Sequence, residues 1–163
     1  MTIKELEPKL IWGIFDEITK VPRPSKKEGK IREFLLDFAK KHNIAAKTDA
    51  IGNVAMRVEA TPGKEGVETL VLQAHMDMVP NQTKPATHNF ETDPIQTVVD
   101  GEWVHTKDFK TTLGADNGIG MAAALAVLTI SHIRNCKNTI SRIYNAMTIC
   151  YFGRCQCKDK GMM

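Results

Sequence analysis

The segment Leu70–Pro80 joins an apolar run to two ionisable side chains. It reads LVLQAHMDMVP, so that His75 and Asp77 follow the apolar residues and Pro80 ends the segment. Alternate side chains of an extended chain point to the same side of the backbone. Catalytic groups and ligands of α/β proteins collect at strand ends. The pattern predicts an imidazole and a carboxylate side by side at the end of a buried strand, although a surface His beside a surface Asp would give the same triplet.

A second segment with possible chemistry is TTLGADNGIG, residues 111–120, which leads into the Ala-rich run Met121–Leu128. Asp116 lies just before this predicted helix or at its cap. As a cap it would accept hydrogen bonds from backbone N–H groups. As a ligand it would offer carboxylate oxygens to a divalent cation. A phosphate loop is a weaker third interpretation, because the glycine spacing fits neither the P-loop nor the dinucleotide fingerprint.

Two amphipathic helices are predicted before these segments. Apolar residues recur at helical spacing over residues 4–19, and Pro22 and Pro24 follow the last of them. Ser25 with Glu28 three positions later is a capping-box pattern, which predicts that a second helix begins at Ser25 and ends near Lys41–Asn43.

The strands are predicted from short alternating or apolar runs. Ile44–Thr48 and Asn53–Glu59 flank a tight corner, and Thr69–Ala74 is the strand that delivers His75. Residues 81–94 are polar and predict an irregular excursion. Ile95–Val99 and Glu102–His105 flank Asp100-Gly101, which is typical of a hairpin turn. The fold class is therefore α/β, with two N-terminal helices, a mixed sheet and a helix after the 111–120 loop.

Composition indicates a globular chain outside the membrane. The 163 residues are 42% hydrophobic and 25% charged, and no apolar run approaches the roughly 18 residues of a membrane span. We see no signal peptide, because Glu5 and Glu7 lie where a basic and then apolar leader would be, so we expect a cytoplasmic location and no membrane partner.

The last 35 residues differ from the rest. Residues 129–163 hold six of the 22 Lys and Arg and one of the 19 acids, whereas residues 1–128 hold 16 basic and 18 acidic residues. All four cysteines also lie there, namely Cys136, Cys150, Cys155 and Cys157. The Cys spacing, even with His132, does not match a zinc finger, and six scattered charges make no nucleic-acid footprint. We therefore expect no nucleic-acid partner, and we divide the chain at residues 1–128 and 129–163.

Taken together, LQAHMDMVP, DPIQTVVDGEWV and TTLGADNGIGMAAALAVL resemble the cytosol non-specific dipeptidases, also called aminoacylhistidine or Xaa-His dipeptidases. These are zinc peptidases of the aminoacylase-1/carboxypeptidase G2 superfamily. Three separated segments match in the right order, and the resemblance covers residues 1–128. It implies the N-terminal part of a zinc-peptidase catalytic domain that acts on dipeptides and, at full length, could form a homodimer.

The resemblance also implies roles for three residues. His75 is similar to a ligand of one metal ion, Asp116 to the carboxylate that bridges two ions, and Asp77 to the catalytic-site aspartate that orients the histidine. A carboxylate that accepts a hydrogen bond from the other ring nitrogen of a ligating histidine agrees with the spacing described above. The implied cofactor is two Zn²⁺ ions, with Co²⁺ or Mn²⁺ as alternatives, which would share and activate a water molecule.

The family pattern stops after Leu128. Such dipeptidases carry a Glu-Glu pair about thirty residues beyond the bridging Asp, the first Glu as general base and the second as a metal ligand, and further Asp and His ligands later. Here Asn145-Ala146-Met147-Thr148 stands at that distance, and no adjacent acids follow Asp116. We expect a truncated and inactive dipeptidase, with a non-catalytic metal-binding fragment or a related deacylase as alternatives.

A frameshift soon after Leu128 would explain both the change in composition and the missing Glu pair. Translating the underlying DNA in the other two frames tests this hypothesis, which fails if neither frame yields a segment like TxTEE shortly after codon 128.

Overall fold

The computed structural model of the chain describes residues 1–60, 62–63, 65–66, 68–130 and the backbone of 138–144. Its elements, in chain order, are a short 3₁₀ helix η1 (Ile3–Glu5), helices α1 (Lys9–Thr19) and α2 (Gly29–Lys41), strands β1 (Ala45–Thr48), β2 (Val54–Glu59), β3 (Leu70–His75), β4 (Thr97–Asp100) and β5 (Trp103–Thr106), a second 3₁₀ helix η2 (Lys107–Phe109), helix α3 (Ala115–Thr129) and strand β6 (Asn138–Tyr144). The predicted mixed α/β class is confirmed.

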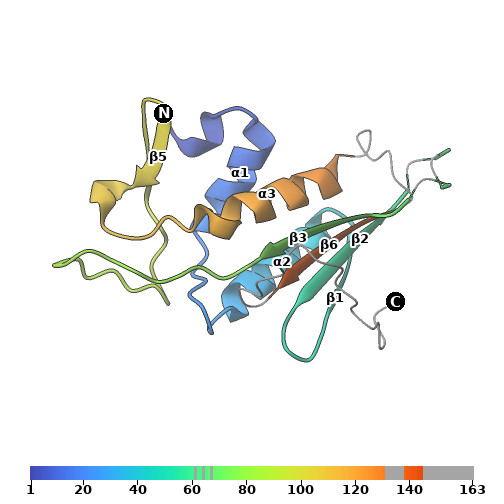
Figure 1. Cartoon of the computed structure of the whole chain (residues 1–163), viewed down its shortest axis with the longest axis horizontal. Helices are drawn as coiled ribbons and strands as arrows, with labels where there is room; N and C mark the ends of the chain where they lie inside the picture. Colours follow the sequence, from blue (N-terminus) through green and yellow to red (C-terminus); the bar gives the residue numbers. More distant parts are fainter. Residues whose placement is uncertain (61, 64, 67, 131–137, 145–163) are drawn as a thin grey trace, which may run out of the picture.

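The main sheet has the strand order β1-β2-β6-β3. β1 and β2 pair antiparallel, β2 and β6 also pair antiparallel, and β6 runs parallel to β3. The chain reaches β6 from β3 by way of the β4–β5 hairpin and α3, as Figure 1 shows, in keeping with the long crossover that parallel strands require. Strand β3 therefore has one hydrogen-bonded neighbour among the described strands, which leaves it at the sheet edge.

One face of this sheet packs against the helices. Alternate residues of β2 are buried, and they join apolar residues of α1, α2 and α3 in a single core cluster. This cluster includes Phe15, Ile31, Leu35, Phe38, Val54, Met56, Met121 and Leu125. In β3 only Ala74 is buried, whereas Leu70 and Val71 are 45% and 51% exposed. The expectation of a buried strand before His75 is therefore wrong, because β3 lies at an edge.

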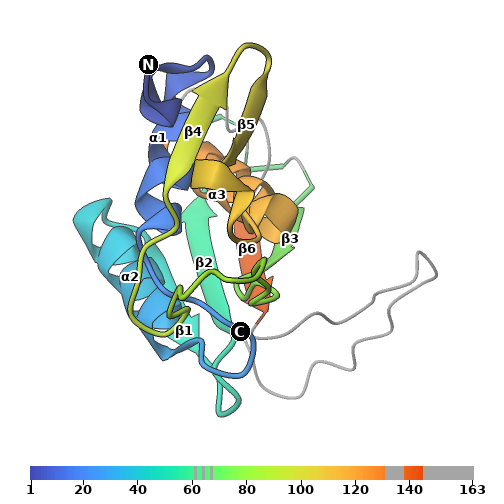
Figure 2. The ribbon, with the colours of Figure 1, turned by 90° about the vertical axis from the view of Figure 1, so that its left-hand side faces the viewer.

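The hairpin of β4 and β5 forms a separate two-stranded unit beside η1 and the N-terminus (Figures 1 and 2). Its register pairs Asp100 with Trp103, so the turn residues are Gly101 and Glu102 rather than the predicted Asp100-Gly101. Gly101 has a φ of +56°, the left-handed conformation that such a turn needs.

Both N-terminal helices begin later than predicted. The chain is extended at Leu6 and α1 starts only after Pro8, because proline has no N–H with which to continue a helix from residue 4. Helix α2 starts at Gly29 with Glu28 as its N-cap residue, not at Ser25. Lys26 has a φ of +72°, which is incompatible with a helix, and Ser25 uses its hydroxyl elsewhere.

The segment after residue 128 contributes one element that sequence analysis did not predict. The backbone of Asn138–Tyr144 inserts between β2 and β3, with Val71 opposite Ile140 and His75 opposite Tyr144. His132 and the four cysteines lie outside the described residues, so the expectation that they form no metal site stays a prediction, as does the boundary after residue 128.

Candidate metal centre

His75 and Asp77 lie side by side, as the alternating pattern predicted. His75 is the last residue of β3, and Asp77 lies two residues further, where the strand has ended. The Nδ1 atom of His75 is 2.9 Å from Oδ1 of Asp77 and 3.1 Å from its backbone carbonyl oxygen. An ionised carboxylate and a carbonyl only accept hydrogen bonds, so in the tautomer with its proton on Nδ1 the imidazole donates to these two oxygens. Nε2 is then an acceptor with a free lone pair.

Asp116 supplies the group that faces this lone pair. Its Oδ1 atom is 3.1 Å from Nε2 of His75, although the two residues lie on different elements. The cap interpretation is wrong: Gly114 is the N-cap residue of α3, and Asp116 itself has a non-helical backbone at φ −91° and ψ 108°. The side chain of Asp116 is 88% exposed and that of His75 is 18% exposed, so the pair opens to solvent.

These two side chains could hold a divalent metal ion. In the tautomer with its proton on Nδ1, Nε2 and Oδ1 are both acceptors, and a cation between them would satisfy both. Ligands at about 2.0–2.2 Å from zinc in tetrahedral arrangement lie about 3.3 Å apart, close to the 3.1 Å observed between these two atoms. Imidazole nitrogen and carboxylate oxygen also belong to the donor set that zinc takes in proteins.

Asp77 is oriented by a residue that sequence analysis assigned to a helix cap. Ser25 donates its hydroxyl hydrogen to Oδ2 of Asp77 over 2.5 Å, which leaves Oδ1 for His75. The Asp77 side chain is only 7% exposed, so both of its oxygens are satisfied by protein groups. The role of Ser25 has no signature in the sequence, because the same Ser and Glu28 match a capping box equally well.

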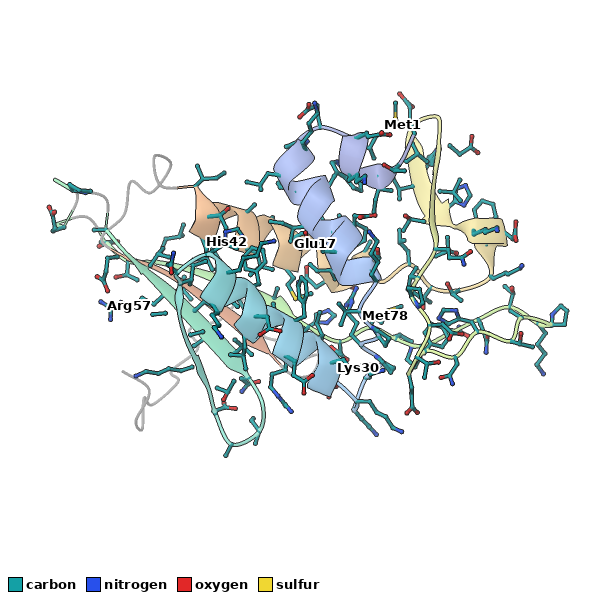
Figure 3. All side chains as sticks on the ribbon, turned by 180° about the vertical axis from the view of Figure 1, so that it is seen from behind. Met1, Glu17, Lys30, His42, Arg57 and Met78 are labelled. Carbon is teal, nitrogen blue, oxygen red and sulfur yellow. The ribbon has the colours of Figure 1, made fainter. Side chains whose placement is uncertain are left out.

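The backbone next to Ser25 runs alongside the backbone after Asp77. Pro24 and Met78 form a parallel bridge, in which the N–H of Met78 donates to the Arg23 carbonyl over 2.9 Å and the N–H of Ser25 to the Met78 carbonyl over 3.1 Å. Figure 3 shows Met78 beside the segment that follows α1. These bonds hold the α1–α2 connection against the end of β3.

One imidazole and one carboxylate do not complete a metal site. Within the part of the chain that the structure describes, no group of three or more His, Cys, Asp or Glu side chains is arranged to hold a metal ion. Catalytic zinc usually has three protein ligands. The described residues could therefore supply two ligands of a metal centre, fewer than a catalytic zinc requires.

A hollow of about 730 Å³ lies elsewhere, between the 83–96 excursion and residues 106–111. His88 lines it, and its Nε2 atom is buried without a hydrogen-bond partner among the described residues. None of His75, Asp77 and Asp116 lines this hollow. The convergent donors are at the end of β3, and we place the chemistry there.

Comparison with known proteins confirms the resemblance inferred from the three segments. Over 131 residues, 80% of this chain, the sequence is 44% identical to the cytosol non-specific dipeptidase of Escherichia coli. The crystal structure of aminoacylhistidine dipeptidase from Vibrio alginolyticus matches 91% of the chain with a TM-score of 0.85 and 40% identity. No family model matches the chain.

The matched part is a minority of these relatives. The chain spans 27% of the Escherichia coli protein and 30% of the Vibrio protein. A dinuclear metal-binding peptidase of the M20 family from Bacillus subtilis has the same fold over 82% of the chain, with a TM-score of 0.50 and 13% identity, and the chain covers 33% of it.

Proposed function

We propose that this chain carries one side of the dinuclear metal centre of a cytoplasmic zinc dipeptidase. In this proposal His75 is a ligand of one ion, Asp116 bridges two ions, and Asp77 orients His75. The observation that carries it is the double contact of the His75 ring, with Asp77 on Nδ1 and Asp116 on Nε2. The names of the Escherichia coli and Vibrio relatives support dipeptides as the substrate, and the Bacillus subtilis peptidase supports a pair of metal ions.

Each of these residues would have a defined role in such a site. Asp77 accepts a hydrogen bond from the Nδ1–H group of His75, which fixes the tautomer and makes Nε2 a better electron-pair donor to a metal. The second oxygen of Asp116 is available to a second ion because the side chain is exposed. The chemistry that the two ions supply in these sites is polarisation of the scissile carbonyl and a lowered pKa of a shared water.

We further propose that the 163-residue chain binds a metal ion weakly and does not turn over dipeptides. The sequence has no glutamate after Glu102, so nothing in it corresponds to the general base that the resemblance requires beyond Asp116. A non-catalytic metal-binding role is the second candidate, favoured by the presence of two donors but no group of three among the described residues. Both candidates share the same metal site and differ in turnover.

Cobalt binding tests the site. The full chain is alkylated at its cysteines, so that thiolates cannot bind, and Co²⁺ is titrated while its visible absorption is recorded. We expect saturable binding that weakens at least about tenfold in the separate variants His75→Ala and Asp116→Ala. His42→Ala, which removes an imidazole at the C-terminal end of α2, is the matched control and should bind Co²⁺ as the parent chain does.

Two results would count against the proposal. Cobalt binding that is the same in the parent chain and in His75→Ala would show that His75 is not a metal ligand and would contradict the proposed site. Hydrolysis of a Xaa-His dipeptide by the chain, abolished by EDTA, would show that the proposed inactivity is wrong while leaving the metal site intact.

A further inference from the structure

Arg23 is among the largest fully buried side chains of the described residues, with 1% of its surface exposed. It lies in the connection between α1 and α2, between Pro22 and Pro24. Burial lowers the pKa of its guanidinium to about 10, and the charge of Asp77 opposes this shift. Arg23 therefore remains charged at neutral pH. Burying a charge is costly unless hydrogen bonds compensate it, so the partners of this guanidinium are informative.

The partners are backbone carbonyls from both sides of the candidate metal centre. Nη1 donates to the carbonyl oxygens of Met76 and Asp77 over 3.1 and 3.0 Å. Nη2 donates to the carbonyl oxygen of Gly114. Met76 directly follows His75, and Gly114 lies two residues before Asp116. One planar group thus joins the segment that carries the imidazole to the segment that carries the opposing carboxylate.

The glycines around Arg23 fit this arrangement closely. A Cβ atom at Gly114 would lie 2.6 Å from Nη2 of Arg23, and one at Gly118 would lie 2.7 Å from the same atom. Gly114 also has a φ of +71°, which a residue with a side chain rarely adopts. The start of α3 can approach the end of β3 this closely because two positions in it lack side chains.

We propose that Arg23 is a positioning residue, which sets the separation of His75 and Asp116 by holding their two segments to one guanidinium. The guanidinium has its donors in a rigid fork, so it fixes distance and orientation together, whereas a lysine ammonium is a point charge on a flexible stem. The expected consequence of losing Arg23, weaker metal binding, rests on the proposed metal site. The separation of His75 and Asp116 is a property of the metal-free chain.

The alternative is that Arg23 only satisfies three buried carbonyls and fills space. In that case its loss would destabilise the fold as any core substitution does, and the contact between His75 and Asp116 would persist in the folded molecules. The test must therefore read that contact directly and compare it with a core substitution of similar cost elsewhere.

The experiment uses the full 163-residue chain, labelled with ¹³C and ¹⁵N and free of metal. The nuclear Overhauser effect between Hε1 of His75 and the β protons of Asp116 is measured in the parent chain, in Arg23→Lys and in Arg23→Met. The matched control is Leu35→Ala, which truncates a fully buried residue of α2 and leaves a cavity in the core. Far-UV circular dichroism establishes which variants are folded.

We expect the nuclear Overhauser effect between His75 and Asp116 in the parent chain and in Leu35→Ala. In the folded Arg23 variants its intensity should fall at least fivefold. Cobalt binding to alkylated protein should weaken about tenfold in the same variants and remain unchanged in Leu35→Ala. An undiminished effect in Arg23→Lys or Arg23→Met would overturn the inference, as would its absence from the parent chain. If neither Arg23 variant folds, Arg23 is a core residue and the inference is also wrong.

The two proposals fail in different ways. A parent chain that binds no Co²⁺ but loses the His75–Asp116 effect on substitution of Arg23 would contradict the proposed function and retain the positioning role. If the parent chain and the Arg23 variants bind Co²⁺ equally well and all show the nuclear Overhauser effect between His75 and Asp116, the positioning role is contradicted. The proposed metal site is then retained.

Discussion

Asp77 uses its two carboxylate oxygens for two different partners. Oδ1 accepts from His75, and Oδ2 accepts from the hydroxyl of Ser25. A carboxylate with one oxygen free could rotate about its terminal torsion, because such sp² torsions are soft. The second hydrogen bond therefore fixes the carboxylate plane and, through it, the direction in which Nε2 of His75 points. Ser25 therefore acts on His75 through Asp77.

Substitution of Ser25 should weaken metal binding without removing a ligand. In Ser25→Ala the Oδ2 atom of Asp77 loses its donor, and we expect Co²⁺ binding to the alkylated chain to weaken about tenfold, within the range seen for outer-shell partners of metal ligands.

Ser25→Thr keeps the hydroxyl and serves as the control. Its Co²⁺ affinity should return to within about twofold of the parent value. Equal weakening in the Ala and Thr variants would mean that shape at this position matters and the hydrogen bond does not.

Helices α1 and α3 pack against each other at a glycine. A Cβ atom at Gly118 in α3 would lie 2.8 Å from Cε2 of Phe15, a fully buried residue of α1, and equally close to the guanidinium of Arg23. Helix α1 has its own glycine, Gly13, where an added Cβ would meet nothing within 4 Å. The same substitution should therefore have opposite effects in the two helices.

Gly118→Ala should lower the free energy of unfolding by about 1–3 kcal/mol, because neither the ring nor the buried guanidinium can move away freely. Gly13→Ala should raise it by about 0.5–1 kcal/mol, since alanine loses less backbone entropy in a helix interior. Urea denaturation followed by circular dichroism measures both. A Gly118→Ala chain as stable as the parent would show that the α1–α3 contact is looser than described.

On the scale of the whole molecule, the main sheet ends at β3 among the described strands. An exposed edge strand with apolar side chains is a template for pairing with another chain. Val71 lies on this edge, 51% exposed, and on the face opposite the buried Ala74.

None of the described helices is long and apolar enough to cross a membrane.

A charge on this edge should reduce self-association. We expect Val71→Lys to lower the fraction of large species in size-exclusion chromatography at a given protein concentration, with the circular dichroism spectrum unchanged. Leu10→Lys, which places the same charge on a 41% exposed position of α1, is the control and should change the fraction little. An equal decrease in both variants would attribute the effect to net charge and not to the strand edge.

The local features of this protein could be predicted from neighbouring residues. Alternation in Leu70–Pro80 brought His75 and Asp77 to one side, and the apolar spacing located the helices and strands to within a few residues, because these properties depend on neighbours in the chain. Ser25 and the start of residues 4–19 were assigned incorrectly because a capping box and an amphipathic repeat say nothing about distant hydrogen-bond acceptors or a break at Pro8.

The contacts between residues far apart in the chain follow from the packing of the fold. The contact between His75 and Asp116, the hydroxyl of Ser25 on Asp77, the guanidinium of Arg23 across two segments and the insertion of Asn138–Tyr144 beside β3 all join residues far apart in the chain. Such contacts arise from packing three helices on one sheet face, and no local pattern records them. The His-x-Asp triplet could therefore be recognised in the sequence, but the residues that hold it in place could not.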